Sequence, residues 1–116
     1  MTLDDFKKYI IAFRDERNWK QFHDPKNLAA ALAIEAAELQ ELFLWKNNDE
    51  IATMLEDERA RNKIGQELSD VFVYLLLMSE SCGLDIISEA EKKMKHNAEK
   101  YPIEKSYNSH KKYTEL

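Results

Sequence analysis

Apolar residues recur every three to four positions along most of this chain, and this period predicts helices rather than strands. The expected helices, four long and one short, cover approximately residues 2–17, 25–45, 50–55, 57–81 and 85–100. Local chemistry sets their ends, because Asp24 and Pro25 favour an N-cap and first helical position and Gly83 favours a left-handed C-cap. Pro102 prevents continuation of the last helix. The aperiodic polar residues after it predict a loose tail that orders only against a partner.

These elements fit one domain. The chain has 116 residues with only two glycines and two prolines, and it contains no internal linker or repeat. We therefore expect an all-α, four-helix bundle-like domain over residues 1–102 and a C-terminal tail over residues 103–116.

The second predicted helix carries acidic residues where its pattern calls for apolar ones. Four leucines between positions 28 and 42 share one face of this helix. Glu35 falls in the middle of that face and Glu38 lies at its edge. A buried ion pair is one explanation. Residues 27–45 contain no basic side chain, however, so its partner would have to come from another helix.

A second carboxylate pair repeats this spacing in the third long helix. Glu67 and Asp70, like Glu35 and Glu38, stand three positions apart, so both carboxylates of a pair project from one side of their helix. Taken alone, the second pair is typical of an exposed flank. If the two helices face each other, four carboxylates share one site, and a cation is needed to compensate them. Oxygen-only ligands favour Mg²⁺, or alternatively Mn²⁺, over zinc.

The segment over residues 71–78 is apolar on every side of its predicted helix. Such a helix requires cover on both sides. In so short a chain we expect the second cover to come from another subunit, which predicts a homodimer or homotetramer. A helix sandwiched between the tail and the first helix is the alternative.

Charge and cysteine content narrow the possible partners and compartments. The formal net charge of −5 argues against nonspecific binding to nucleic acid or an anionic membrane. The longest apolar run, over residues 71–78, is too short to span a bilayer. The single cysteine, Cys82, and the lack of a signal-peptide pattern favour a reducing compartment, so we expect a cytoplasmic protein.

Aromatic side chains flank the predicted second helix and offer flat surfaces on which a base can stack. Trp19 and His23 precede this helix, although such rings usually close the core and a loop histidine usually forms a hydrogen bond. Trp45 is expected on the same helix side as Glu38, about 10 Å further along the axis. Tyr74 follows Glu67 and Asp70 on one stripe of the third long helix and is also a candidate.

Polar residues recur near the end of the last predicted helix. Its lysines could bind phosphates and its amide could read a base edge or a sugar, whereas without the carboxylates these positions would indicate a solvated face. The candidates are Lys93, Asn97, Lys100 and Tyr101.

Together, these residues resemble the MazG-like branch of the all-α nucleoside triphosphate pyrophosphohydrolases, and most closely its dCTP pyrophosphatase-like subgroup. The similarity covers approximately residues 18–102. It is carried by WKQFHDPKNL at 19–28, IEAAELQEL at 34–42, Trp45, ELSDV at 67–71, Tyr74, Lys93, Asn97 and KYP at 100–102.

The resemblance implies a MazG-type fold, an oligomer with composite sites, and cleavage between the α- and β-phosphates to a nucleoside monophosphate and pyrophosphate. It implies that Mg²⁺ binds to Glu35, Glu38, Glu67 and Asp70. We favour Glu38 as the group that orients or deprotonates the attacking water. The resemblance assigns Trp19, His23, Trp45, Asn97 and Tyr101 to the nucleoside and Lys93 and Lys100 to the phosphates.

Other functions are compatible with the same pattern. One is a non-catalytic helical interaction module, and another is a dUTPase-like or phosphoribosyl-ATP pyrophosphohydrolase-like activity. A di-iron carboxylate bundle is less favoured, because those proteins use Glu-x-x-His pairs and neither pair here contains histidine. The preferred base, the use of a normal or damaged nucleotide, and the number of metal ions stay open at this point.

Overall fold

The computed structural model describes residues 1–116. Its regular elements are all helices, without strands, and they fall into two units, residues 1–83 and 84–116. The first unit contains α1 (Leu3–Glu16), the 3₁₀-helix η1 (Lys20–Phe22), α2 (Pro25–Glu41), α3 (Asn48–Glu56) and α4 (Glu58–Ser81). The second contains α5 (Ile86–Lys100), α6 (Ile103–Ser106) and the 3₁₀-helix η2 (Tyr113–Glu115). The all-α prediction is confirmed, while the bundle-like arrangement and the oligomer stay predictions.

Short polar side chains begin the long helices, and one of them, Asp24, is the N-cap that the sequence predicted. Thr2 and Asp5 form a reciprocal capping box before α1, in which each side chain accepts a hydrogen bond from the other residue's backbone N–H. Asp24 caps α2 and accepts a hydrogen bond from the backbone N–H of Asn27 at 2.8 Å. A cap of this kind typically stabilises a helix by about 1 kcal/mol. The caps of α3, α4 and α5 are Asn47, Asp57 and Asp85.

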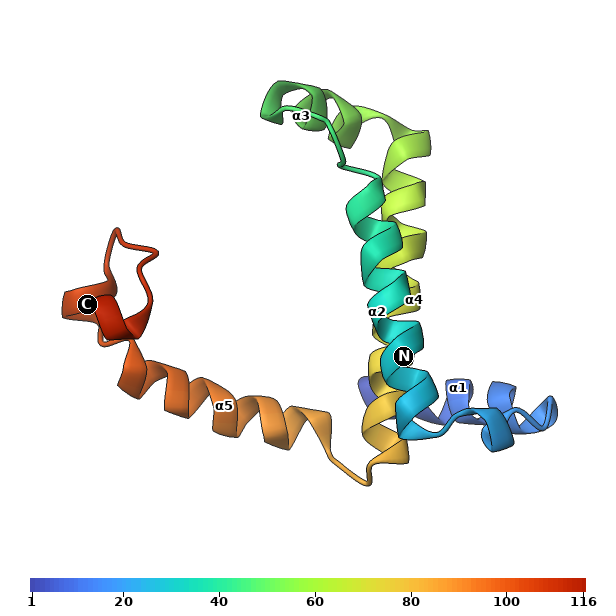
Figure 1. Cartoon of the computed structure of the whole chain (residues 1–116). Helices are drawn as coiled ribbons and strands as arrows, with labels where there is room; N and C mark the ends of the chain where they lie inside the picture. The colour runs from blue at the N-terminus through green and yellow to red at the C-terminus, as the bar shows by residue number, and fades with distance from the viewer. The chain divides into compact units, whose positions relative to one another are not determined.

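Helix α4 is the element around which the first unit packs. Helix α2 runs antiparallel beside it, and α1 and α3 also contact it (Figure 1). The buried apolar side chains are Ile10 of α1, Leu28 of α2, and Leu76 and Leu77 of α4. Burying a side chain of this size contributes about 1.5–3 kcal/mol. These contacts hold the two carboxylate-bearing helices side by side.

The end of α2 differs from the prediction. The helix ends at Glu41, four residues before Trp45. From Leu42 onward the backbone hydrogen bonds span three residues instead of four, as in the bond from Leu42 N–H to the carbonyl of Leu39. Trp45 adopts the left-handed conformation with a φ of 66°. The apolar pattern continued past the point where the backbone turns, so the expectation that Trp45 shares a helix side with Glu38 is wrong.

The C-terminal tail also differs from the prediction, because it is ordered within the second unit. After Pro102, residues 103–106 form α6 and residues 113–115 form η2. The rings of Tyr101 and Tyr113 pack edge to face with centroids 6.1 Å apart. An aromatic contact between residues twelve positions apart leaves no periodic signal in the sequence.

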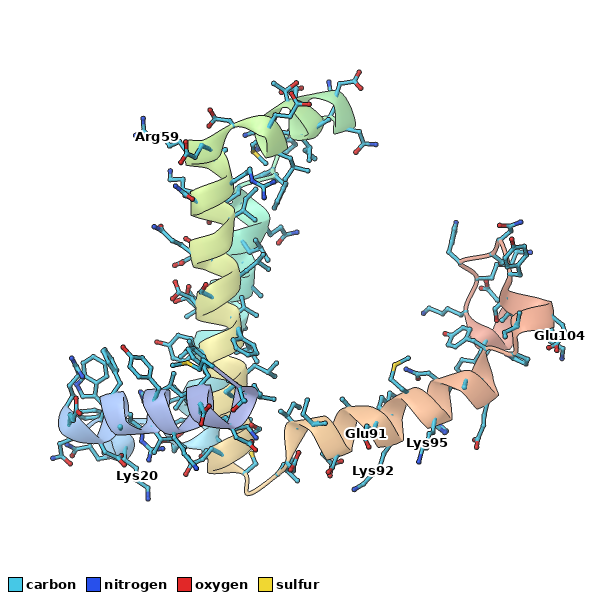
Figure 2. All side chains as sticks on the ribbon, turned by 180° about the vertical axis from the view of Figure 1, so that it is seen from behind. Lys20, Arg59, Glu91, Lys92, Lys95 and Glu104 are labelled. Carbon is cyan, nitrogen blue, oxygen red and sulfur yellow. The ribbon has the colours of Figure 1, made fainter.

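The apolar segment of α4 is only partly covered within one chain. Leu76 and Leu77 are buried, but Leu68, Phe72 and Leu75 are exposed, with Leu68 at 51%. Their spacing of four and three positions places these three on one side of α4. By contrast, charged side chains such as those of Lys20 and Arg59 extend outward from the first unit (Figure 2). No single helix is long and apolar enough to cross a membrane; only the bent pair of α4 and α5 together has the length and composition for it.

We expect this exposed stripe to be covered by a second copy of the chain, so light scattering at micromolar concentration should give the mass of a dimer or tetramer. Leu68→Gln should shift the mass toward the monomer, because it places an amide in an apolar interface. Leu55→Gln, at an exposed leucine of α3, is the matched control and should leave the mass unchanged. A monomeric wild-type protein with full helix content would contradict this prediction.

Candidate metal centre and adjoining pocket

Three carboxylates meet where α2 and α4 run side by side. Glu35 and Glu38 come from α2 and Glu67 comes from α4, and one oxygen of each lies within 4.8 Å of the others. Glu35 and Glu67 are half-buried and Glu38 is exposed. Asp70 lies outside this compact group, but its charge acts on both Glu35 and Glu67. The structure therefore brings three of the four predicted ligands together and keeps the fourth within electrostatic range.

The three-carboxylate cluster has no compensating positive charge. No Lys, Arg or His forms an ion pair with any of its members, which removes the alternative of a buried ion pair. Burial, a hydrogen bond shared with Glu38, and the surrounding negative charges raise the pKa of Glu35 to about 7. Burial and the charge of Glu38 likewise raise the pKa of Glu67. Glu41, which the sequence analysis did not single out, adds to the negative field at Glu67.

These carboxylates fit a metal ion. Glu35 Oε2 and Glu67 Oε2 are buried and accept no hydrogen bond from the protein. A buried acceptor without a donor is unfavourable, and two of them beside mutually repelling carboxylates create a strong demand for a cation. The donor atoms are all oxygens, which are the ligands of hard divalent ions. Glu35, Glu38 and Glu67 could therefore hold a metal, with Asp70 nearby.

An apolar pocket of about 290 Å³ adjoins Asp70 in the first unit. Its walls come from α1, the segment between α1 and α2, and α4. Three of the predicted nucleoside-binding residues, Trp19, His23 and Tyr74, line it, and Asp70 lines it as well. Sequence reasoning missed Tyr9, whose ring lies on the wall although its side chain is largely exposed. Asp70 therefore acts electrostatically on the carboxylate cluster and also lines the aromatic-walled pocket.

Trp19 and His23 form one wall of this pocket. The ring centroid of Trp19 lies 6.0 Å from that of Phe13 in an edge-on arrangement and 6.5 Å from that of His23. The Nδ1 atom of His23 is buried and has no hydrogen-bond partner. Burial, and secondly the charge of Arg14, lower the pKa of His23, so its imidazole is neutral at pH 7. A neutral imidazole with an unused nitrogen can form one hydrogen bond to a ligand.

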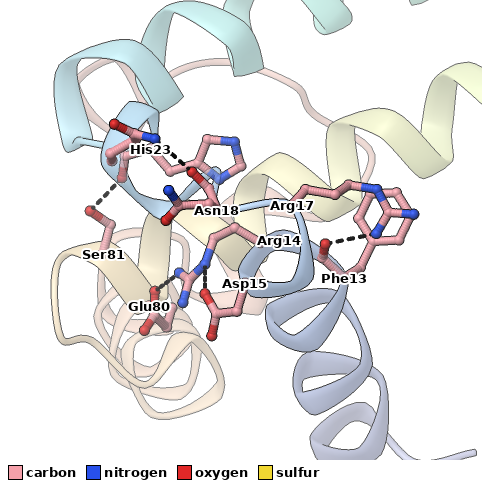
Figure 3. Close-up of polar contacts among 9 residues, drawn as sticks. Phe13, Arg14, Asp15, Arg17, Asn18, His23, Glu80 and Ser81 are labelled. Carbon is pink, nitrogen blue, oxygen red and sulfur yellow. Dashed lines mark hydrogen bonds and ion pairs between the residues drawn. The ribbon is translucent and has the colours of Figure 1, made fainter.

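Arg14 is the buried charge of this region, and unlike the glutamates it is compensated. Its Nε donates to Asp15 at 2.9 Å and its Nη1 donates to Glu80 of α4 at 2.8 Å (Figure 3). Arg14 was not among the residues predicted from the sequence. Its signal was its position four residues after Ile10, which places a basic side chain on the buried stripe of α1.

The same region fixes the backbone of the pocket wall. The carbonyl of Arg14 accepts a hydrogen bond from the backbone N–H of Trp19 at 3.1 Å. The hydroxyl of Ser81 in α4 donates to the carbonyl of His23 at 3.3 Å (Figure 3). The segment that carries Trp19 and His23 is thereby tied to both α1 and α4.

The remaining predicted residues are not part of this site within the first unit. Trp45 is 92% exposed and follows the far end of α2, a 17-residue helix. A helix of that length rises about 25 Å, so Trp45 of the same chain does not reach the pocket. Lys93, Asn97 and Lys100 lie on α5, and Tyr101 is its C-cap, all in the second unit.

The fold and the cluster define an all-α protein with a candidate carboxylate metal centre. The model of the MazG-like family matches residues 30–116, and the chain belongs to this family. The match includes residues 103–116, which the sequence analysis had placed outside the resemblance. By class, the protein is a nucleotide pyrophosphohydrolase, that is, an enzyme rather than an interaction module.

Individual relatives agree with this assignment. The chain is 39% identical over 115 residues to dCTP pyrophosphatase 1 of Mus musculus and 40% identical to that of Homo sapiens, covering 99% of this chain and 68% of each relative. A solved structure of a pyrophosphatase from Archaeoglobus fulgidus is similar with a TM-score of 0.81 and 37% identity. That similarity covers 86% of this chain and 92% of the other.

The electrostatics of the cluster predict a pH-dependent stability for the metal-free protein. Because folding raises the pKa of Glu35 from its ordinary value of 4.5 to about 7, the folded state binds its proton more tightly than the unfolded state does. Stability should therefore fall as the pH rises from 4.5 through 7. Glu35→Gln should raise the melting temperature in chelator at pH 8 and change it little at pH 4.

Glu91→Gln, at an exposed carboxylate of α5, is the control and should change neither melting temperature. Equal melting curves for wild type and Glu35→Gln at pH 8 would contradict the repulsion described for this cluster.

Proposed function

We propose that the protein hydrolyses a pyrimidine nucleoside triphosphate, dCTP or a modified relative of it, to the monophosphate and pyrophosphate with Mg²⁺. The observation that carries this proposal is the position of Asp70. It contributes to the negative field of the carboxylate cluster and also lines the aromatic pocket. A phosphate group held at the cluster would therefore have an apolar site for a base beside it.

In this proposal, Mg²⁺ is held by Glu35, Glu38, Glu67 and Asp70. Such an ion neutralises charge on the phosphates and lowers the pKa of a bound water. Glu38 is the exposed member of the cluster, so its carboxylate is accessible to solvent and can orient or deprotonate the attacking water. Glu35 and Glu67 are more enclosed, which suits them to binding rather than proton transfer.

The pocket is the proposed site of the base. The rings of Trp19 and Tyr74 provide stacking surfaces, and the free Nδ1 of His23 provides one hydrogen bond. A volume of about 290 Å³ lies at the lower end of the range for ligand pockets, which favours one small ring system over a whole nucleotide. The relatives named dCTP pyrophosphatase 1 support cytosine as that base.

The proposal assigns the remaining residues by resemblance. Lys93 and Lys100 bind phosphates, while Asn97 and Tyr101 contact the nucleoside. Trp45 is too far from the pocket of its own chain, so in this proposal its exposed indole contacts the nucleotide bound to a second copy. This assignment of Trp45 requires a homodimer or homotetramer with composite sites.

A panel of nucleoside triphosphates with Mg²⁺ tests the proposal directly. We expect dCTP to yield dCMP and pyrophosphate, with a higher kcat/KM than purine triphosphates. Glu38→Gln should reduce kcat at least a hundredfold, by about the contribution of general base catalysis. Glu16→Gln, at an exposed carboxylate of α1, should leave turnover unchanged. Release of inorganic phosphate in place of pyrophosphate, or no hydrolysis of any nucleotide, would show the proposal to be wrong.

Trp45→Ala tests the composite site. Since the indole is 92% exposed, its removal should leave the melting temperature unchanged. Loss of a stacked base should cost about 1–3 kcal/mol, seen as a higher KM and a weaker preference among bases. If kcat/KM for all nucleotides falls together with the melting temperature, Trp45 is a packing residue and does not read the base.

A further inference from the structure

The C-terminal segment folds back onto the last turn of α5 within the second unit (Figure 1). The reversal follows α6 and includes Asn108, which has a φ of 63° in the left-handed region that asparagine tolerates. It brings the ring of Tyr113 edge-on to that of Tyr101, with centroids 6.1 Å apart. The same ring lies 4.7 Å from Nζ of Lys100. One aromatic side chain of the tail thus contacts both residues that end the helix.

Lys100 is held by this ring without being neutralised. It forms no ion pair, whereas Lys92 of the same helix pairs with Glu89 at 3.0 Å. The face of an aromatic ring attracts an ammonium group but carries no charge. The positive charge and the remaining N–H donors of Lys100 therefore stay available to an anion.

Lys100 also belongs to a row of polar residues on α5. Lys93, Asn97 and Lys100 are spaced by four and three positions, so they project from one side of the helix. Lys93, like Lys100, forms no ion pair. Lys92 and Lys95, three positions apart, project together from one side of this helix (Figure 2). Two unpaired ammonium groups on one side suit a ligand with several negative charges.

We propose that Tyr113 is a positioning residue, which orders Lys100 for binding the phosphates of the nucleotide. This inference rests on the proposed function, in which Lys100 contacts those phosphates. A lysine side chain has many rotamers, and restricting them before the ligand arrives reduces the entropy lost on binding. Tyr113 is therefore expected to act on ground-state affinity rather than on the chemical step.

The experiment uses the full chain with three single substitutions in the tail. Tyr113→Ala should raise KM for dCTP about two- to fivefold, the effect of one exposed cation–π contact, with little change in kcat. Tyr113→Phe keeps the ring and should behave like wild type. Tyr107→Ala removes a tyrosine of the same segment that is 78% exposed and should have no effect.

A double-mutant cycle separates positioning from general destabilisation. If Tyr113 acts through Lys100, Tyr113→Ala should add nothing to KM in a Lys100→Ala background. Equal effects of Tyr113→Ala in both backgrounds would overturn the proposal and make Tyr113 a packing residue. A lower KM in Tyr113→Ala would also overturn it, because the ring would then be withholding Lys100 from the substrate.

Binding of pyrophosphate with Mg²⁺, measured by calorimetry, provides a readout that does not depend on turnover. We expect Tyr113→Ala to weaken this binding two- to fivefold, by about the loss of the same contact, and Tyr113→Phe to leave it unchanged. If the wild type hydrolysed no nucleotide, the proposed function would fail, and this binding difference would still decide the role of Tyr113. Equal affinities of wild type and Tyr113→Ala would refute that role.

Discussion

The central constraint on this structure is that apolar packing holds carboxylates close together although no positive side chain pairs with them. Glu35 and Glu67 repel each other and lose hydration, yet the packing of α2 against α4, with Leu28 buried, keeps their helices together. A fold stabilised by apolar contacts tolerates a local electrostatic penalty of this kind because the burial of apolar side chains offsets it. A bound cation would relieve this penalty, which makes the cluster a candidate site for a positively charged ligand.

A comparison of the buried charges shows which of them serve the fold. Arg14 is buried, but Asp15 and Glu80 accept its hydrogen bonds, so its charge is compensated and it ties α1 to α4. Glu35 and Glu67 retain unpaired buried oxygens. A compensated buried ion stabilises a particular arrangement of the chain, whereas an uncompensated one is a candidate ligand-binding group. The same reasoning applies to Nδ1 of His23, which is unpaired and lies on the pocket wall.

Outside the cluster, two apolar features also lack a partner within one chain. The stripe of Leu68, Phe72 and Leu75 leaves apolar surface in water, and Trp45 exposes nearly its whole indole. A contiguous exposed apolar patch can mark a binding surface. Our proposal accounts for both with one arrangement, in which a second copy covers the stripe and supplies its Trp45 to the neighbouring pocket.

Sequence alone determined the features that depend on neighbours within one or two helical turns. The caps at Thr2, Asp24 and Asp85 follow from hydrogen bonds between residues three apart, and the stop at Gly83 follows from its backbone freedom. The carboxylate pairs were also visible, because a helix converts a spacing of three into one side. The wheel position of Glu35 predicted that it would face another helix, and the structure places it there.

Only the tertiary structure decided what depends on residues distant in sequence. It ended α2 before Trp45, paired Arg14 with Glu80, placed Tyr113 on Lys100, and left Asp70 between cluster and pocket. None of these has a periodic signature. The pairings result from segments that meet in space, and α2 ends where its backbone hydrogen bonds shorten from four residues to three. The sequence was sufficient to identify the carboxylates. That no basic side chain pairs with them depends on which helices pack beside them, and only the tertiary structure shows this.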